Sequence, residues 1–207
     1  MEQESVICIV DDDEAIRESV RLLLFAAGLR CRVYASADAL LSDKTDQVFD
    51  CMLLDIRMPG TDGLELFRVL QEDQVPYPII FITGHGDIPL AVTAIKQGAY
   101  DFLTKPFRSG ELLERVRSAL AAHHEMRQQR QELLALCSRF ESCTPRETDV
   151  MRLLADGLSN KGIADALCIS PRTVEIHRAH VMEKMSADSL PALVRMVAIL
   201  EKSGSLS

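Results

Sequence analysis

The chain has 207 residues, of which 47% are apolar, so it contains enough apolar side chains to form hydrophobic cores. This composition excludes a chain that is disordered as a whole, and the length fits one large or two small domains. No signal-peptide pattern begins the chain, and no apolar segment approaches the length that crosses a bilayer. We therefore expect a cytoplasmic protein with no membrane partner.

The net charge of −8 is unevenly distributed along the chain. Residues 1–125 contain 12 Lys+Arg against 21 Asp+Glu, a balance of −9, whereas residues 126–207 contain 11 against 10, a balance of +1. An acidic first half and a near-neutral second half indicate two modules with different partners.

The 6 cysteines form no C-x-x-C pair, and none has the spacing to histidine that is typical of a metal site. Two of them, Cys8 and Cys51, lie inside apolar segments. We expect all of them to be reduced packing residues rather than metal ligands or redox sensors.

The first half alternates between short apolar segments and segments with helical periodicity. Strands are expected at residues 6–10, 31–34, 51–54, 79–82 and 102–103, and helices at 16–27, 36–42, 63–72, 88–97 and 109–120. The helix that begins at Ile88 is expected to bury Ala91, Val92 and Ile95. Strict alternation of five strand–helix units predicts an α/β doubly wound fold, a flavodoxin-like sheet of five parallel strands with right-handed crossovers.

Polar side chains stand where four of these strands end. Asp11 and Asp12 follow the first strand, Asp55 the third, Thr83 the fourth and Lys105 the fifth. Open α/β sheets bind ligands at the carboxyl ends of their strands, so we expect these side chains to share one site. Asp13, next in the chain, is interpreted as an acid at a helix start.

Clustered carboxylates repel one another, and oxygen ligands suit a hard cation such as Mg²⁺. A carboxylate nucleophile beside a metal ion and a lysine suits phosphoryl transfer. We therefore expect Asp55 to accept a phosphoryl group, Asp11 and Asp12 to hold Mg²⁺, Lys105 to pair with the phosphoryl oxygens and Thr83 to donate a hydrogen bond to them.

Together, Val10-Asp11-Asp12, Leu54 to Gly60, Thr83 to Asp87 and Lys105-Pro106-Phe107 resemble the receiver domain of two-component response regulators, over about residues 5–122. The resemblance implies that Asp55 is phosphorylated and that Mg²⁺ or Mn²⁺ is bound by Asp12, Asp55 and the main-chain carbonyl of Arg57, with support from Asp11. It also implies a cis Lys105–Pro106 bond and a switch pair formed by Thr83 and Phe102, although many relatives have Tyr where this chain has Phe102.

Residues 123–140 are polar and contain neither Gly nor Pro, which predicts a helical linker. The pattern leaves open whether this linker extends the preceding helix or forms a separate one. A single heptad of apolar residues favours a solvated spacer over a coiled coil.

The second half contains four helix starts, each marked by a capping residue: Thr144, Ser159, Ser170 and Ser189. Four short helices with tight turns favour a helix-turn-helix module over residues 141–203, with a small helical interaction domain as the alternative. On a helical wheel of residues 171–185, Val174, Arg178, Val181 and Met185 share one side. Arg172, Glu175, Ile176, Ala179 and Glu183 lie on the other.

Leu158 to Ala164 and Ile169 to Arg178 resemble the LuxR-type DNA-binding domain of the NarL/FixJ regulators, in its FixJ branch. We expect contacts to phosphates from Lys161, Thr173, His177, Arg178 and Lys184, and contacts to base edges from Arg172, Glu175, Ile176 and Ala179. Gly162 replaces the Glu or Gln usual in that helix. The last helix, with Leu193, Val194 and Val197, is the candidate dimer contact.

The combined interpretation is a bacterial transcriptional activator that receives a phosphoryl group from a sensor histidine kinase, dimerises and binds promoter DNA beside RNA polymerase. It is not an enzyme beyond Mg²⁺-dependent self-phosphorylation and self-dephosphorylation. Two alternatives are a DNA-binding regulator that does not depend on phosphorylation and a phosphatase with an aspartyl-phosphate intermediate. The phosphatase would need an Asp-x-Asp loop and a cap domain, but a helix directly follows Asp11-Asp12-Asp13.

Overall fold

The computed structural model describes residues 5–43, 45, 48–73 and 77–206. The chain forms two compact units, Met1–Met126 and Arg127–Ser207. The predicted receiver and DNA-binding segments each fall within one unit. The predicted linker is divided between them, because one helix, α5 (Ser109–Glu141), runs through the predicted boundary. The linker therefore extends the preceding helix.

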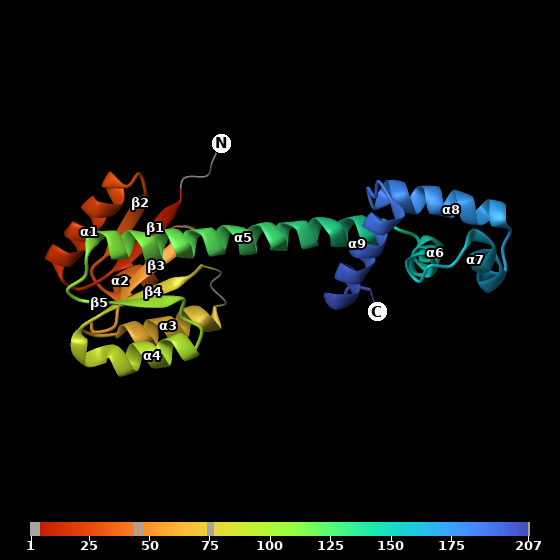
Figure 1. Cartoon of the computed structure of the whole chain (residues 1–207). Coiled ribbons are helices and arrows are strands. Elements are labelled where there is room, and N and C mark those ends of the chain that lie inside the picture. The colour runs from red at the N-terminus through yellow and green to blue at the C-terminus, as the bar shows by residue number, and fades with distance from the viewer. Residues whose placement is uncertain (1–4, 44, 46–47, 74–76, 207) are drawn as a thin grey trace. The chain divides into compact units, whose positions relative to one another are not determined.

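In the first unit, a five-stranded parallel sheet has the strand order β2-β1-β3-β4-β5 (Figure 1). Its elements are β1 (Val6–Val10), α1 (Glu14–Ala26), β2 (Arg30–Tyr34), α2 (Ala37–Leu41), β3 (Cys51–Asp55), α3 (Gly63–Glu72), β4 (Ile79–Thr83), the 3₁₀ helix η1 (His85–Asp87), α4 (Ile88–Lys96), β5 (Asp101–Thr104) and the first part of α5. The predicted doubly wound fold is confirmed.

Every residue of β3 and β4 is buried, as a strand covered on both faces requires. On one face, α1 and α5 bury Val20, Leu24, Leu112 and Val116; on the other, α2, α3 and α4 close a second core (Figure 1). The central strands β3 and β4 are thus held between two layers of helices, whereas the edge strand β2 is partly exposed, with Val33 43% exposed.

Three helix starts in this unit follow the expected capping chemistry. Ser36 accepts from Ala39 N before α2, Asp13 accepts from Ala15 N and Ile16 N before α1, and Asp62 forms a capping box with Glu65 before α3. The interpretation of Asp13 as a helix-start acid is therefore confirmed.

One predicted core position is wrong. Val92 was expected inside α4 but is 41% exposed, whereas Ala91 and Ala94 are buried. The small alanines face the sheet and bring α4 close to it, so the outward side of α4 carries the larger residues Ile88 and Val92.

The second unit contains the end of α5 and the helices α6 (Pro145–Ala155), α7 (Asn160–Leu167), α8 (Pro171–Lys184) and α9 (Leu190–Lys202). The predicted N-caps Thr144, Ser159, Ser170 and Ser189 all accept a backbone hydrogen bond from the N3 residue. A core gathers between these helices from Val150, Met151, Leu154, Ile163, Val174, Val181, Met185, Leu193, Val197 and Leu200.

This core corrects the predicted dimer contact on the last helix. Leu193 is 0% and Val197 3% exposed, so both belong to the interior of the unit, while Val194 is 37% exposed. Apolar residues occur on more than one side of α9, and periodicity alone did not distinguish its inner side from its outer side.

All six cysteines are free. Cys8 and Cys51 are buried, but Cys168 is exposed, so the prediction that all six are packing residues is wrong for Cys168. Within the described part of the chain, none of the helices combines the length and the apolarity that crossing a membrane requires.

Gly162 occupies the N3 position of α7, and its amide donates to the Ser159 hydroxyl at 3.2 Å. A Cβ there would meet Ser159 Oγ at 3.6 Å and Leu158 at 3.8 Å, which is ordinary contact. Gly162→Ala should therefore stabilise the second unit by about 1 kcal/mol, through helix propensity and a less flexible unfolded chain. Hydrogen exchange of peptides from residues 145–202 should slow about fivefold.

Gly157→Ala is the matched control, because Gly157 has φ +84° and a Cβ there is strained although the space is open. That substitution should accelerate exchange in the same peptides. Equal effects of Gly162→Ala and Gly157→Ala on hydrogen exchange would contradict the difference that we assign to the two glycines. Gly162→Glu should stabilise the second unit more than Gly162→Ala does, because the glutamate adds the second half of a capping box with Ser159.

Candidate functional site

An ammonium group joins two carboxylates at the carboxyl edge of the sheet. Lys105 Nζ donates to Asp11 Oδ2 at 2.7 Å and to Asp55 Oδ2 at 2.6 Å. The side chains of Asp11 and Asp55 are 1% and 8% exposed, and that of Lys105 is 22% exposed. Residues that lie 50 and 94 positions from Lys105 in the chain therefore meet at one edge of the sheet, as their positions at strand ends predict. We call this mostly buried cluster the acidic pocket.

The backbone around the pocket fixes these side chains. Asp11 Oδ1 accepts from Asp13 N at 2.9 Å, and Asp55 Oδ1 accepts from Arg57 N at 3.3 Å. Lys105 N donates to Thr83 O at 2.7 Å, which continues the β4–β5 pairing beyond Thr104. Behind the acceptor, a side chain at Gly63 would collide with the main-chain carbonyl of Asp55, so glycine permits this close approach.

The charges in the pocket influence one another. Burial raises the pKa of the Asp55 carboxyl above its ordinary value, although the hydrogen bond and the charge of Lys105 oppose that rise. Burial also lowers the pKa of Lys105, but the hydrogen bonds to Asp11 and Asp55 outweigh it and keep this pKa above its ordinary value. Lys105 is therefore a fixed positive charge beside Asp55 at neutral pH.

Asp12 completes the group of acids. It is exposed, and Asp11, Asp12 and Asp55 each offer a carboxylate oxygen within 4.8 Å of the other two. Three oxygens of this kind at an open edge fit a hard divalent cation that keeps part of its water shell. Within the described residues the three carboxylates face one ammonium group, so the pocket retains an excess of negative charge that a cation would neutralise.

Thr83 and Phe102 lie on the neighbouring strands β4 and β5. Thr83 is fully buried and its hydroxyl donates to Gly84 O at 3.3 Å, a long bond that leaves the hydroxyl available for another partner. Phe102 is half-buried and packs against the core beneath α4. The predicted cis bond between Lys105 and Pro106 is confirmed.

In the second unit, α8 presents one open side. Arg172, Glu175, Ile176 and Ala179 recur at helical spacing and are all exposed, while Val174, Val181 and Met185 on the other side are buried. Arg172 Nη1 lies 3.5 Å from Glu175 Oε2. The wheel prediction is thus confirmed for these residues, whereas Arg178, predicted on the inner side, is only half-buried. The predicted base-reading residues share one face.

The predicted phosphate contacts are placed less uniformly. Lys161 on α7 is exposed, whereas Thr173, His177, Arg178 and Lys184 are half-buried. Arg178 Nη1 donates to Asn160 Oδ1 at 3.3 Å, which joins α8 to the start of α7. Lys184, whose side chain is 33% exposed, is engaged in an ion pair within the unit.

Lys184 forms an ion pair that sequence reasoning missed. Its Nζ donates to Glu147 Oε2 at 2.6 Å and to Ser142 O at 2.9 Å, and His180 Nδ1 lies 3.4 Å from Glu147 Oε1. Glu147, 3% exposed, also completes the capping box with Thr144. One carboxylate therefore attaches the end of α8 to the start of α6.

A second missed ion pair lies beside the acidic pocket. Arg57 Nε and Nη2 both approach Asp87 Oδ1, at 2.9 and 2.8 Å. The two residues are 30 positions apart, and neither local spacing nor periodicity signals such a pair. The motif from Thr83 to Asp87 contained Asp87, but its partner was not predictable from it.

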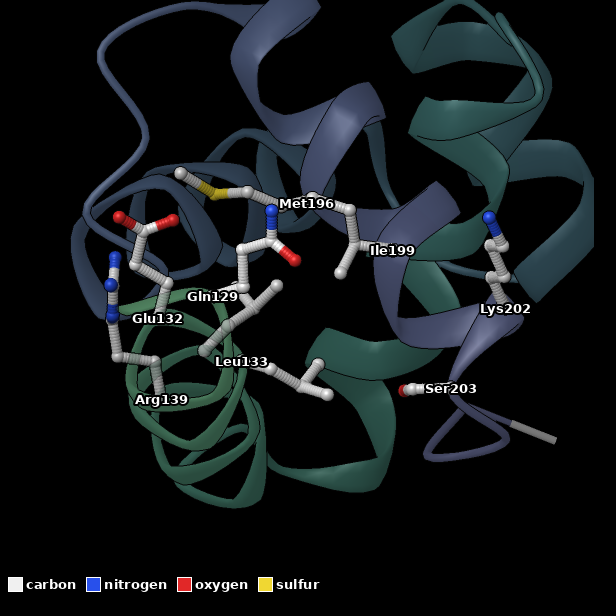
Figure 2. A pocket seen from close by; sticks show the side chains of 9 residues that line it. Gln129, Glu132, Leu133, Arg139, Met196, Ile199, Lys202 and Ser203 are labelled. Carbon is white, nitrogen blue, oxygen red and sulfur yellow. The ribbon is translucent and has the colours of Figure 1, made fainter. Parts of the chain in front are cut away.

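The second unit also has a groove of about 670 Å³ between α5 and α9 (Figure 2). Leu133, Met196 and Ile199 are among the residues that line it, with Glu132 and Lys202 at its polar margins. No predicted DNA-contact residue lines this groove, so it is separate from the open side of α8.

Comparison with known proteins identifies the family to which each part of the chain is similar. Residues 7–117 match the response regulator receiver domain family, and residues 141–197 match the bacterial regulatory proteins of the luxR family. The chain is 44% identical over 202 residues to the response regulator protein TmoT of Ectopseudomonas mendocina, covering 98% of this chain and 92% of the relative. It is 44% identical over 190 residues to the transcriptional regulatory protein FixJ of Bradyrhizobium diazoefficiens, covering 92% and 93%.

Among solved structures, the response regulator StyR matches with a TM-score of 0.85 at 40% identity, covering 95% of this chain and 99% of that one. Full-length FixJ from B. japonicum matches with a TM-score of 0.62 at 42% identity, covering 97% and 98%.

Glu147 should make the stability of the second unit depend on pH. Burial would raise its pKa, but hydrogen bonds from Lys184 and Thr144 lower it from 4.5 to about 2. Because the folded-state pKa lies below the unfolded value, the stabilisation is fully present above pH 4.5 and is lost as the pH falls toward 2. Glu147→Gln should cost about 2 kcal/mol at pH 7, and this difference from wild type should shrink below pH 4.5 in urea unfolding.

Asp149→Asn is the control, because Asp149 lies on the same helix and its ion pair with Arg146 is longer, at 3.7 Å, and partly exposed. It should change the unfolding free energy by a few tenths of a kcal/mol. A difference between Glu147→Gln and wild type that stays constant from pH 7 to pH 2 would contradict the role given to Glu147.

Proposed function

The chain belongs to the NarL/FixJ-type two-component response regulators, and we propose that the signal reaches it as a phosphoryl group on Asp55. It is a phosphorylation-controlled transcriptional regulator, with a receiver domain followed by a LuxR-type DNA-binding domain. These domains imply a sensor kinase and promoter DNA as partners. A regulator that binds promoter DNA acts where the chromosome is, which in bacteria is the cytoplasm.

The observation that supports Asp55 as acceptor is the Lys105 bridge. Lys105 holds the Asp55 carboxylate at 2.6 Å and orients it at the open edge of the sheet. A carboxylate oxygen of Asp55 attacks the phosphorus of a phosphohistidine on the kinase, an O–P bond forms, and the N–P bond breaks with its electrons returning to the histidine ring. Lys105 then pairs with the phosphoryl oxygens.

Asp11, Asp12 and Asp55, with the main-chain carbonyl of Arg57, would hold Mg²⁺ or Mn²⁺ in the pocket. When bound, the ion supplies positive charge that stabilises the phosphoryl oxygens during transfer. The same residues support self-phosphorylation from small donors and self-dephosphorylation, and no other catalytic activity is proposed.

Thr83 and Phe102 would transmit the effect of Asp55 phosphorylation to the surface of the receiver unit. A phosphoryl group on Asp55 accepts a hydrogen bond from the Thr83 hydroxyl, whose present bond to Gly84 O is long at 3.3 Å. Movement of Thr83 toward the phosphoryl group frees space beside Phe102, and the ring turns inward. The change would alter the surface formed by α4 and β5.

That surface is where we place the dimer contact. The outward residues Ile88 and Val92, one helical turn apart on α4, are exposed together with Tyr100 before β5. An apolar stripe directly after the end of β4 suits contact with a second copy of this chain, once the loop that follows β4 has moved. Dimerisation presents two DNA-binding units to paired half-sites, and the bound dimer activates transcription through RNA polymerase.

On the DNA, the exposed side of α8 would enter the major groove. Arg172, Glu175, Ile176 and Ala179 would contact base edges. Lys161, Thr173, His177 and Arg178 would contact phosphates. Lys184 has three N–H donors, two of which serve Glu147 and Ser142, so the third is available for a phosphate.

The two alternatives carry less support. Among the described elements, no cap domain that would enclose a small phosphate ester covers the carboxyl edge of the sheet, as a phosphatase of that kind would need. A regulator independent of phosphorylation would leave the joined set of Asp11, Asp55, Thr83 and Lys105 without a purpose.

Incubation with Mg²⁺ and acetyl phosphate, followed by intact-protein mass spectrometry, tests the acceptor. Wild type should gain one phosphoryl group, because Lys105 orients the Asp55 carboxylate at the carboxyl edge of the sheet, and Asp55→Asn should gain none. Asp13→Asn is the control, because Asp13 caps α1 and should still permit the gain. No gain in wild type, or an equal gain in Asp55→Asn, would refute Asp55 as the acceptor for this donor.

DNA affinity measured over a range of salt concentrations tests the interface. Arg172→Ala should weaken binding to the operator by about 1–3 kcal/mol and relax base preference at one position, because it loses base-edge hydrogen bonds. Lys161→Ala should weaken binding to all DNA sequences alike. It should also reduce the slope of log K against log salt by about 1, because one phosphate contact is lost.

Glu201→Gln on α9 is the control for these measurements, because it lies on another helix of the second unit. A uniform loss for Arg172→Ala or a base-specific loss for Lys161→Ala would reverse the roles assigned to these residues.

A further inference from the structure

Arg57 is the cation whose position calls for an explanation. It follows Asp55 by two residues, and its amide donates to Asp55 Oδ1 at 3.3 Å, so its main chain borders the acidic pocket. Its side chain, however, is 71% exposed, with Nε and Nη2 donating to Asp87 Oδ1 at 2.9 and 2.8 Å. The guanidinium is thus bound to Asp87 rather than to the three acids of the pocket.

Asp87 is well placed to hold it. Its side chain is only 13% exposed, and its amide donates to Gly84 O at 3.1 Å within the turn of η1. Thus the acid is fixed on the loop after β4, while the arginine extends to it from the loop after β3. A carboxylate that accepts two N–H groups on one oxygen holds an otherwise flexible side chain in one direction.

The alternative position for Arg57 is the pocket itself. Asp11, Asp12 and Asp55 bring three carboxylates within 4.8 Å, and Lys105 supplies one ammonium. An unpaired guanidinium beside them would be attracted, because arginine binds carboxylates with two parallel hydrogen bonds and is weakly hydrated. In that position it would occupy the oxygens that a divalent cation needs.

We propose that Asp87 is a positioning residue that holds the Arg57 guanidinium outside the acidic pocket and so leaves the carboxylates of Asp11, Asp12 and Asp55 free for a divalent cation. The inference rests on the proposed function, because it concerns the same pocket. Asp87 raises the pKa of Arg57 most, and the charge of the nearby Asp62 raises it further. Asp62 is a weaker candidate for holding the guanidinium, because its Oδ1 already accepts from Glu65 N at 2.8 Å as the cap of α3.

The experiment is a titration of the full chain with MgCl₂, followed by the NMR amide signals of residues 11–13 and 55–57, in wild type, Asp87→Ala, Arg57→Ala and the double variant. Asp87→Ala should weaken Mg²⁺ binding roughly fivefold, because the released guanidinium competes for the carboxylates. Arg57→Ala should bind at least as tightly as wild type, and the double variant should bind like Arg57→Ala.

The double variant separates competition from simpler causes. If Mg²⁺ affinity fell only because the charge of Asp87 is missing, the fall from wild type to Asp87→Ala would equal the fall from Arg57→Ala to the double variant. That result would overturn the proposal. A double variant as weak as Asp87→Ala would assign the effect to a disturbed loop and would also overturn it. Asp87→Asn, which keeps the shape of the side chain, should show a smaller loss in the same direction.

A matched control removes an acid that does not contact Arg57. Asp38 on α2 accepts from Thr61 Oγ1 at 2.9 Å, at the other end of the same loop, and Asp38→Asn should leave Mg²⁺ binding within about twofold of wild type. Wild type that binds no Mg²⁺ would overturn the metal site itself. Wild type that binds normally, with Asp87→Ala unchanged, would overturn only the role of Asp87.

Discussion

The bridge from Lys105 to Asp11 and Asp55 is the interaction on which the receiver unit depends. Neighbouring strands are about 4.8 Å apart, so β5 lies roughly 10 Å from β3, and only a long side chain spans that distance. The strand order β2-β1-β3-β4-β5 places β1 and β3 side by side, so one ammonium meets both acids. The parallel direction of all strands is what brings the three residues to the same edge.

That bridge does not neutralise the pocket. Three carboxylates against one ammonium retain a net negative charge, and the buried position of Asp55 raises its pKa. In the second unit, by contrast, Glu147 and Lys184 balance one another, and the pKa of Glu147 falls to about 2. The unbalanced site therefore suits a cation and a transferred group, whereas the balanced pair sets the position of a helix.

The sequence predicted those features that local chemistry determines. Apolar segments, caps such as Ser36 and Thr144, and polar residues at strand ends identified the elements and the pocket. It did not predict Arg57–Asp87 or Glu147–Lys184, because these partners are 30 and 37 positions apart and depend on how loops meet. It also misplaced Val92 and Leu193, since periodicity finds apolar positions but does not say which side of a helix faces the core.

The charge balance of the second half of the chain supports the proposal that dimerisation controls DNA binding. Residues 126–207 have a balance of +1, and Arg178 and Lys184 already donate to Asn160 and Glu147. A single DNA-binding unit with a charge balance near zero gains little from counterion release. Joining two units makes the second binding event intramolecular, which raises affinity without any new contact. A change of dimerisation by Asp55 would therefore be sufficient to change promoter occupancy, with no rearrangement inside the DNA-binding unit.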